Sequence, residues 1–195
     1  AHGAADAIGD NVYAALAITR VGYEDPTLAE RLPITILAAP HPVPDERSLA
    51  AGEALVQFLD QAPDEARFLF LISGGASSLV ERLAGHADAE ALARLNERLL
   101  AGGVDITRMN QIRKAVSTIK GGRLARWLRG RRTDLLLISD VPGDDPAVIG
   151  SGLLAADPHP LSAEHAAALL PPGLMPADPP PPPNASVFAS VQPRI

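Results

Sequence analysis

Cysteine is absent from this chain of 195 residues, and aromatic residues make up only 4% of it. The absence of cysteine excludes disulfide bonds and metal sites built on thiolates, and it fits a protein of the cytosol. Because aromatic side chains are scarce, Leu, Ile, Val and Ala must fill the core. Hydrophobic residues amount to 47% of the chain, which is enough for one globular domain of ordinary size.

Long apolar runs, a secretory signal and an excess of positive charge are also missing. No run approaches the roughly 20 apolar residues that a transmembrane helix needs. The formal net charge is −6 and the sequence pI is about 5.3, which argues against a general nucleic-acid-binding protein. We therefore expect a cytoplasmic protein that binds neither nucleic acid nor membrane. Because the chain starts with Ala-His-Gly and not with Met, we also expect that its natural start is missing.

Short apolar runs alternate with longer segments of helical periodicity. The runs suit buried strands in length and β-branched content, and they lie at 14–20, 34–39, 68–72 and 134–139. The helical segments include 45–62 and 88–100, in which leucines recur on one side. Strands separated by helices predict a parallel sheet that is covered on both faces. We expect a three-layer, doubly wound α/β fold with a mainly parallel, Rossmann-like sheet.

Proline changes the character of the chain after residue 157. We expect residues 1–157 to form the α/β core and residues 158–195 to form a proline-rich segment. This segment is predicted to hold a short helix at 162–170 and a strand at 186–191, on either side of an extended run of prolines at 179–183. A last strand with nothing after it suggests that the chain ends in the middle of a fold.

The third predicted strand leads into a turn that is rich in glycine and hydroxyl groups. Its candidate ligand-binding residues are Ser73, Gly74, Gly75, Ser77 and Ser78. In an open parallel sheet, ligands bind beyond the carboxyl ends of the strands, and glycines let backbone N–H groups approach an anion. The spacing is not that of a Walker phosphate loop. A tight strand-to-helix turn with a serine N-cap is the alternative.

Three carboxylates follow the fourth predicted strand, namely Asp140, Asp144 and Asp145. Pro142 and Gly143 fit the central positions of a type II turn, which would bring Asp144 back toward Asp140. Close carboxylates repel each other unless a cation or a basic side chain lies between them, and Mg²⁺ prefers one or two carboxylates with phosphates and water. The alternative is a solvated loop that caps the next helix.

A basic segment without any acid runs from residue 108 to 132 and holds nine of the 17 basic residues. We predict a helix at 108–120 whose polar side chains form one line at spacings of three or four. The line consists of Asn110, Arg113, Ser117 and Lys120. Such a line suits a carboxylate or a phosphate, whereas we interpret the arginines from 126 to 132 as a solvated face.

Other strand ends and glycines are further candidates for contact with a ligand. Gly121 and Gly122 follow the basic line, and they either end the helix or bring the backbone near a ligand. Ser151 lies in GSGLLA at 150–155, which formally matches a dinucleotide pattern, but prolines stop any long helix after it. His41 also lies at a predicted strand end, where a structural role is the simpler interpretation.

Four motifs, in order, resemble the glycerate kinases that carry a MOFRL domain. The motifs are PHPVPDE at 40–46, LISGGASSL at 71–79, NQIRKAVSTIKGGRLA at 110–125 and LLISDVPGDDPAVIGSGLLAADP at 136–158. Together they span most of the predicted α/β core. The chain departs from the family pattern at Ala76 and Ala115, where the family has Gly and His, and at Leu153-Leu154, where it has Pro-Thr.

The resemblance implies phosphorylation of D-glycerate to 2-phosphoglycerate with ATP and Mg²⁺ in the cytoplasm. It places the active site in the cleft between this domain and a C-terminal domain that the chain lacks, so we expect the fragment alone to be inactive. The candidate catalytic residues are Lys120, Asp140 and Asp144, with Asp140 and Asp144 as Mg²⁺ ligands. Self-association through the exposed cleft face, as a homo-oligomer, is a further expectation.

Two other functions stay open at this point. Members of the same family have been named hydroxypyruvate reductases, which need NAD(P)H, and the dinucleotide-like pattern here stands in a poor context. A non-catalytic module that binds a small anion is the second alternative, favoured by the missing domain and the altered motifs. Stabilisation by Mg·ATP or glycerate indicates the kinase, and stabilisation by NADH indicates the reductase. Binding of a ligand without turnover indicates the anion-binding module.

Overall fold

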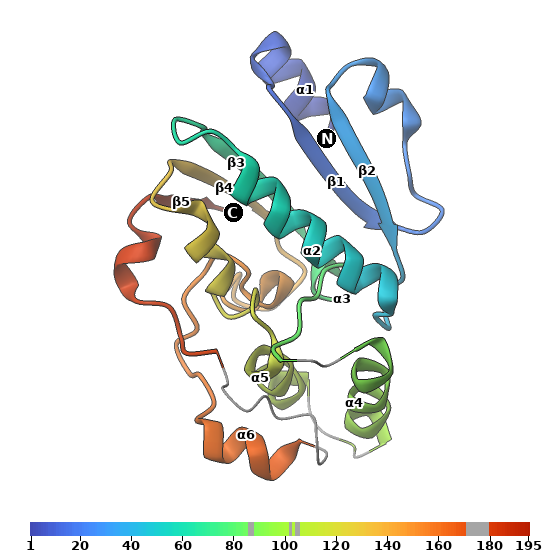
Figure 1. Ribbon diagram of the computed structural model, residues 1–195, viewed down its shortest axis with the longest axis vertical. Coiled ribbons are helices and arrows are strands. Elements are labelled where there is room, and N and C mark those ends of the chain that lie inside the picture. Colours follow the sequence, from blue (N-terminus) through green and yellow to red (C-terminus); the bar gives the residue numbers. More distant parts are fainter. Residues whose placement is uncertain (86–87, 102, 104–105, 171–179) are drawn as a thin grey trace.

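The computed structural model shows a mixed α/β chain (Figure 1). The described residues are 1–85, 88–101, 103, 106–170 and 180–195. The α-helices are α1 (His2–Ile8), α2 (Glu46–Gln61), α3 (Ala76–Leu79), α4 (Ala89–Ala101), α5 (Ile106–Val116) and α6 (Ala163–Leu169). The 3₁₀ helices are η1 (Gly9–Asn11), η2 (Pro26–Glu30), η3 (Arg123–Leu128), η4 (Ile149–Ser151) and η5 (Ala185–Phe188). Within the described ranges, no helix is both long enough and apolar enough to cross a membrane.

The strands form two parallel sheets. β1 (Ala15–Arg20) pairs with β2 (Ile34–Ala39) in the first sheet. In the second sheet, β4 (Thr133–Ile138) lies between β3 (Phe68–Ser73) and β5 (Val191–Arg194), and it is parallel to both. The prediction of an α/β fold with parallel strands is confirmed. The structure adds that the first two strands hydrogen-bond only to each other among the described strands.

Helix α2 joins the two sheets. Its start is fixed by a capping box, in which the Asp45 carboxylate accepts a hydrogen bond from the Arg47 N–H at 2.8 Å and Ser48 Oγ accepts one from the Asp45 N–H at 3.3 Å. The helix contacts both strands of the first sheet, and Leu55 and Leu59 lie in the main core under the second (Figure 1). Burial of each such leucine contributes roughly 1.5–3 kcal/mol.

A second core lies between α4, α5 and α6, which are grouped at the bottom of Figure 1. Leu95 and Leu99 of α4 pack with Ile112 and Val116 of α5, and Ala166 of α6 completes the cluster. The proline-rich segment therefore contributes α6 to this core and β5 to the second sheet. This segment thus packs against the rest of the chain through α6 and β5. The division into a core at 1–157 and a proline-rich segment at 158–195 stays a prediction.

The two faces of the second sheet differ in burial. Leu135 and Leu137 of β4 point into the main core, whereas Ile138 is 73% exposed. Leu71 of β3 and its register partner Leu136 are also among the exposed large hydrophobic residues. In the described part of the chain, helices thus cover the face of β4 that carries Leu135 and Leu137.

The helix predicted at 108–120 ends earlier, at Val116. The hydroxyl oxygen of Ser117 accepts hydrogen bonds from the N–H groups of Ile119 and Lys120, at 3.3 and 3.2 Å. Such side-chain bonds compete with the helical ladder and favour a turn. The predicted polar line is therefore broken between the helix and the turn that follows it.

The strand predicted at 186–191 is wrong, because half of that segment belongs to the 3₁₀ helix η5 and only Val191 lies in a strand. Asn184 starts this helix, since its Oδ1 accepts a hydrogen bond from the Ser186 N–H at 3.1 Å. The observed strand is β5, which begins at Val191. Of the prolines at 179–183, the first lies outside the described residues.

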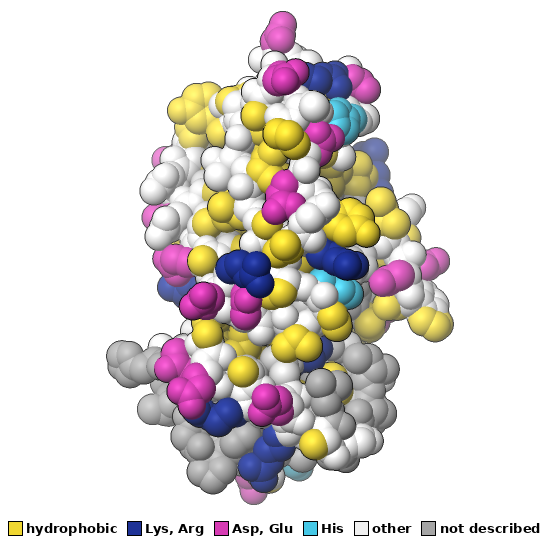
Figure 2. Space-filling model, turned by 90° about the vertical axis from the view of Figure 1, so that its right-hand side faces the viewer, with side chains coloured by type: hydrophobic (Ala, Val, Ile, Leu, Met, Phe, Trp, Pro, Cys, Tyr) yellow, Lys and Arg dark blue, Asp and Glu magenta, His cyan; other side chains and the backbone are white. Residues whose placement is uncertain are grey.

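One face of the molecule is shown in Figure 2. Acidic and basic side chains lie next to one another on it, between hydrophobic side chains. Among the described residues on this face, no continuous surface of one charge sign is visible.

Candidate functional site

Three segments meet beyond the carboxyl ends of the strands. Gly74 and Gly75 follow β3, Asp140 follows β4 and His41 follows β2. A Cβ atom added to Gly74 would lie 1.8 Å from Oδ2 of Asp140, and one added to Gly75 would lie 2.8 Å from Nε2 of His41. The carboxylate and the imidazole therefore lie directly against the backbone of the glycine turn. Any larger residue at either glycine displaces one of these two side chains.

The backbone of the glycine turn carries N–H groups from which no other described residue accepts a hydrogen bond. Within the described residues, the N–H groups of Gly74 and Gly75 have no acceptor. The Gly75 carbonyl accepts hydrogen bonds from the N–H and the hydroxyl of Ser78, both at 3.0 Å. The serine N-cap that we considered is wrong, because Gly75 itself is the N-cap of α3, with a φ of +83°. Two donors at the strand end are thus available to an anion.

The acidic loop after β4 adopts the predicted turn. Gly143 has a φ of +83°, and the Asp144 N–H donates to the Val141 carbonyl at 3.3 Å. Asp145 Oδ1 accepts a hydrogen bond from the Ala147 N–H at 2.8 Å, so this carboxylate caps the next turn. Asp140 and Asp144 are both exposed. In the part of the chain that the structure describes, no group of three or more His, Asp or Glu residues is arranged for a metal ion.

A buried loop supports the glycine turn from behind. The hydroxyl oxygens of Ser77 and Ser151 share a hydrogen bond of 2.6 Å. Ser151 is buried, and it has an unusual φ of +58° for a residue with a side chain. Its carbonyl accepts a hydrogen bond from the Gly121 N–H at 3.0 Å, and the Gly152 carbonyl accepts one from the Gly122 N–H at 2.6 Å. The amides of the second glycine pair are therefore engaged inside the protein.

The same contacts decide the structure of the dinucleotide-like pattern at 150–155. Its first residues form η4 with left-handed backbone at Gly150 and Gly152. No long helix follows, since the next described helix is α6. The pattern is thus not the strand–turn–helix unit that binds the phosphates of a dinucleotide.

Lys120 forms a buried ion pair with Glu81. Both side chains are 1% exposed, and the ammonium donates a hydrogen bond to Oε2 of the carboxylate. Burial lowers the pKa of Lys120, and the charge of Glu81 opposes this shift. Sequence reasoning missed Glu81, because a single acid in LVERLA at 79–84 resembles an ordinary surface residue. Nothing in the local sequence shows that its partner lies 39 residues further on.

Arg113 on α5 is held by a second buried polar residue. Its Nε and Nη2 donate to Oδ1 of Asn96 at 3.1 and 2.6 Å, and Asn96 donates to the Leu92 carbonyl at 2.9 Å. Burial lowers the pKa of Arg113. Asn110 lies on the same helix and is half-buried. Asn96 is the other residue that sequence reasoning missed.

Several basic residues that resemble a solvated face are structural. Arg131 is buried, and its guanidinium donates to backbone carbonyls of Leu59, Ala62 and Trp127, among others. The solvated-face interpretation is therefore wrong for Arg131. Lys114 donates to the Ala147 carbonyl at 2.9 Å, which ties α5 to the loop after β4.

The predicted site residues thus fall into two groups. The group at the strand ends is exposed or half-buried, and it consists of Ser73, Gly74, Gly75, Asp140 and Asp144. The other group lies behind it and consists of Ser77, Ser78, Asn110, Arg113, Lys120, Gly121, Gly122 and Ser151. Most of its members are buried or bonded inside the protein. Ligand binding by either group stays a prediction.

Known proteins of similar sequence include glycerate kinases. A glycerate 2-kinase of Pyrococcus horikoshii is 36% identical over 143 residues, which are 73% of this chain and 31% of the relative. An Agrobacterium vitis protein with the provisional name hydroxypyruvate reductase is 43% identical over 143 residues, which are 73% of this chain and 32% of the relative. The chain thus spans about a third of the length of the curated relatives that it matches.

Solved structures show the same architecture. A glycerate kinase of Thermotoga maritima has a TM-score of 0.78 and 28% identity, over 98% of this chain and 46% of that one. A Pyrococcus horikoshii protein has a TM-score of 0.77 and 32% identity, over 88% of this chain and 39% of that one. A family model described as a domain of unknown function, DUF4147, matches residues 1–171. Because this match covers most of the chain, the chain belongs to the DUF4147 family.

Proposed function

We propose that this chain forms the phosphate-binding part of a glycerate 2-kinase, which uses ATP to convert D-glycerate to 2-phosphoglycerate. The observation that carries the proposal is the glycine turn, where two N–H donors and the Asp140 carboxylate lie together at the strand ends. Proteins named glycerate kinase among the relatives in sequence and in structure support it. In this proposal a further domain forms the other wall of the cleft.

Phosphoryl transfer depends on positioning and on the neutralisation of charge. The N–H groups of Gly74 and Gly75 donate to phosphate oxygens, which approach closely because neither residue has a side chain. The glycerate hydroxyl oxygen bonds to the γ-phosphorus while the bond from that phosphorus to the bridging oxygen of ADP breaks. The proton of the hydroxyl passes to a carboxylate at the site, for which Asp140 and Asp144 are the proposed candidates.

A divalent cation fits the exposed carboxylates of this loop. Asp140 and Asp144 would hold Mg²⁺ together with phosphate oxygens and water, since Mg²⁺ commonly takes only one or two protein carboxylates. The ion neutralises phosphate charge when it is bound. Asn110 and Arg113 are proposed to contact the substrate carboxylate. In this proposal the loop that carries Ser151 holds the glycine turn in place through the Ser77–Ser151 hydrogen bond, and Lys120 lies behind it in its ion pair with Glu81.

A reductase that uses NAD(P)H is the second candidate. The name of the Agrobacterium vitis relative favours it. The structure of 150–155 offers it no support, because that pattern is not followed by the helix that a dinucleotide site requires.

The proposal is tested by the stability of the chain with each ligand. We would measure thermal unfolding with Mg·ATP, D-glycerate and NADH, each against buffer. A ligand at a hundredfold excess over its dissociation constant adds about 2.7 kcal/mol to the free energy of unfolding. Stabilisation by Mg·ATP or D-glycerate that is lost in Asp140→Asn supports the kinase. Stabilisation by NADH alone favours the reductase, and no stabilisation by any ligand contradicts a phosphate site on this chain.

A further inference from the structure

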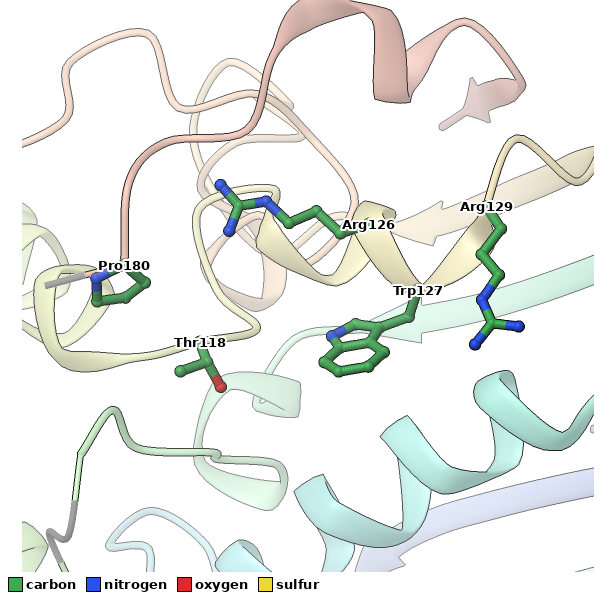
Figure 3. A pocket seen from close by; sticks show the side chains of 5 residues that line it. All are labelled: Thr118, Arg126, Trp127, Arg129 and Pro180. Carbon is green, nitrogen blue, oxygen red and sulfur yellow. The ribbon is translucent and has the colours of Figure 1, made fainter. Parts of the chain in front are cut away.

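A cavity of about 330 Å³ lies apart from the strand ends, along η3. Its lining residues are Thr118, Arg126, Trp127, Arg129 and Pro180 (Figure 3). Neither glycine of the strand-end turn lines it, nor do the loop aspartates. Its volume is at the lower end of the range for small-molecule sites.

The described lining of this cavity offers hydrogen-bond donors and no acid. Figure 3 shows the guanidinium groups of Arg126 and Arg129 on either side of the Trp127 indole. No acceptor for the indole N–H is present among the described residues. The Thr118 hydroxyl is already engaged, since it donates to the Arg82 carbonyl at 3.0 Å and accepts from Arg82 Nη1 at 3.2 Å. The indole and the arginines are therefore the groups that a ligand meets.

The two arginines are not equivalent. Arg129 pairs with the carboxylate of Asp60, so its charge is neutralised within the protein. Arg126 donates from Nη2 to the Pro181 carbonyl at 2.6 Å, which leaves its charge in place. In the described part of the chain, Arg126 forms no ion pair with a carboxylate. Burial lowers the pKa of the neighbouring Arg123, and the charge of Arg126 lowers it further. An anion at Arg126 relieves this repulsion between two cations.

A second cavity of about 660 Å³ adjoins the first, with which it shares Thr118 and Pro180. It is lined by Glu53 and Glu81 as well as by Arg82. Glu53 pairs with Arg82, and Glu81, which is 1% exposed, pairs with Lys120. Of the described charged residues that line the two cavities, Arg126 is therefore the one without a partner of opposite charge, and the phosphate of a ligand is directed to it.

We propose that this pair of cavities binds a small phosphorylated metabolite, with its phosphate at Arg126 and the Trp127 indole N–H. Guanidinium groups bind phosphate through two parallel hydrogen bonds, which an ammonium does not reproduce. The proposal does not depend on the kinase reaction, because the two sites share no lining residue.

The test uses the fluorescence of Trp127, the chain's one tryptophan. We would titrate the chain with inorganic phosphate and with 3-phosphoglycerate at constant ionic strength, and we expect a saturable change in emission. Arg126→Gln should weaken binding about tenfold or more, since a charged hydrogen-bond partner is lost. Arg126→Lys keeps the charge but not the paired hydrogen-bond geometry, so its affinity should lie between that of the unchanged chain and that of Arg126→Gln.

Two control variants keep the proposal falsifiable. Arg132→Gln removes an exposed arginine of the same segment that lines neither cavity, and it should leave the affinity unchanged. Asp140→Asn, at the strand ends, should also leave it unchanged. The proposal is overturned if no saturable change occurs, or if Arg132→Gln weakens binding as much as Arg126→Gln. It is also overturned if Asp140→Asn abolishes the signal, because the phosphate then binds at the strand-end turn, which supports the kinase site instead.

Discussion

This chain has two glycine pairs, one before a hydroxyl-rich segment and one before a basic segment. The backbone amides of the two pairs differ in whether the protein supplies their hydrogen-bond acceptors. The N–H groups of Gly121 and Gly122 donate to the carbonyls of Ser151 and Gly152. The N–H groups of Gly74 and Gly75 have no acceptor among the described residues, while the Asp140 carboxylate lies against Gly74 and the His41 imidazole lies against Gly75. A glycine pair shows that something comes close to the backbone, and the surroundings decide whether it is the protein or a ligand.

The largest effect should come from the ion pair beside the buried glycine pair. In Lys120→Met, the Glu81 carboxylate stays in the interior without its partner, and the free energy of unfolding should fall by about 3–5 kcal/mol. Urea unfolding at neutral pH measures the loss. The double variant Lys120→Met, Glu81→Leu should recover most of it, because the uncompensated charge is gone. A loss below about 1 kcal/mol in the single variant would mean that the pair is not buried as described.

The next effect concerns the buried glycine pair itself. A Cβ atom at Gly122 would lie 2.5 Å from Cζ of Phe188 and 2.8 Å from the Ala155 carbonyl oxygen. Gly122→Ala should cost roughly 1–2 kcal/mol for the left-handed backbone and roughly 1–3 kcal/mol more for the overlap. Gly130→Ala is the matched control, since Gly130 also has a positive φ but open space around it. Equal losses in the two variants, measured by denaturant unfolding, would contradict the close packing at Gly122.

The smallest effect on stability, with the clearest effect on binding, is expected at the exposed pair. Gly74 has no positive φ, and its added Cβ would meet the carboxylate group of the exposed Asp140 side chain. Gly74→Ala should therefore cost about 1 kcal/mol or less in unfolding free energy. It should weaken Mg·ATP binding at least about tenfold, because the carboxylate moves and the methyl group covers the amides. Gly3→Ala, where the added Cβ meets no atom within 4 Å, should leave the affinity for Mg·ATP unchanged and should not destabilise the chain, because Gly3 lies in helix α1, which alanine favours. Calorimetric titration would show whether affinity survives.

The first four strands were predictable from the sequence, whereas the last one was not. The second run, at 34–39, became β2 with the same bounds, because a buried parallel strand needs a continuous apolar stretch. β5 contains Pro193 and Arg194 and pairs only with β4 among the described strands, so no apolar run marks it. The early end of α5 was also hidden, since it depends on a single hydroxyl, that of Ser117.

The two groups of candidate site residues were predictable to different degrees. The meeting of Gly74 with Asp140 follows from the rule that parallel strands end at one edge. The engagement of Lys120 by Glu81 depends on a contact between distant parts of the chain, which neither local pattern contains. A buried polar pair needs both partners, whereas the sequence presents each of them as an ordinary charged residue.

The central claim is that the exposed glycine pair, and not the buried one, binds the phosphate. Two-dimensional NMR of the isotope-labelled chain, titrated with Mg·ATP, resolves the backbone amides of both pairs in one experiment. We expect progressive and saturable shifts of the amide signals of Gly74 and Gly75, with those of Gly121 and Gly122 unchanged. Shifts confined to Gly121 and Gly122, or no saturable shift at either pair, would contradict the account.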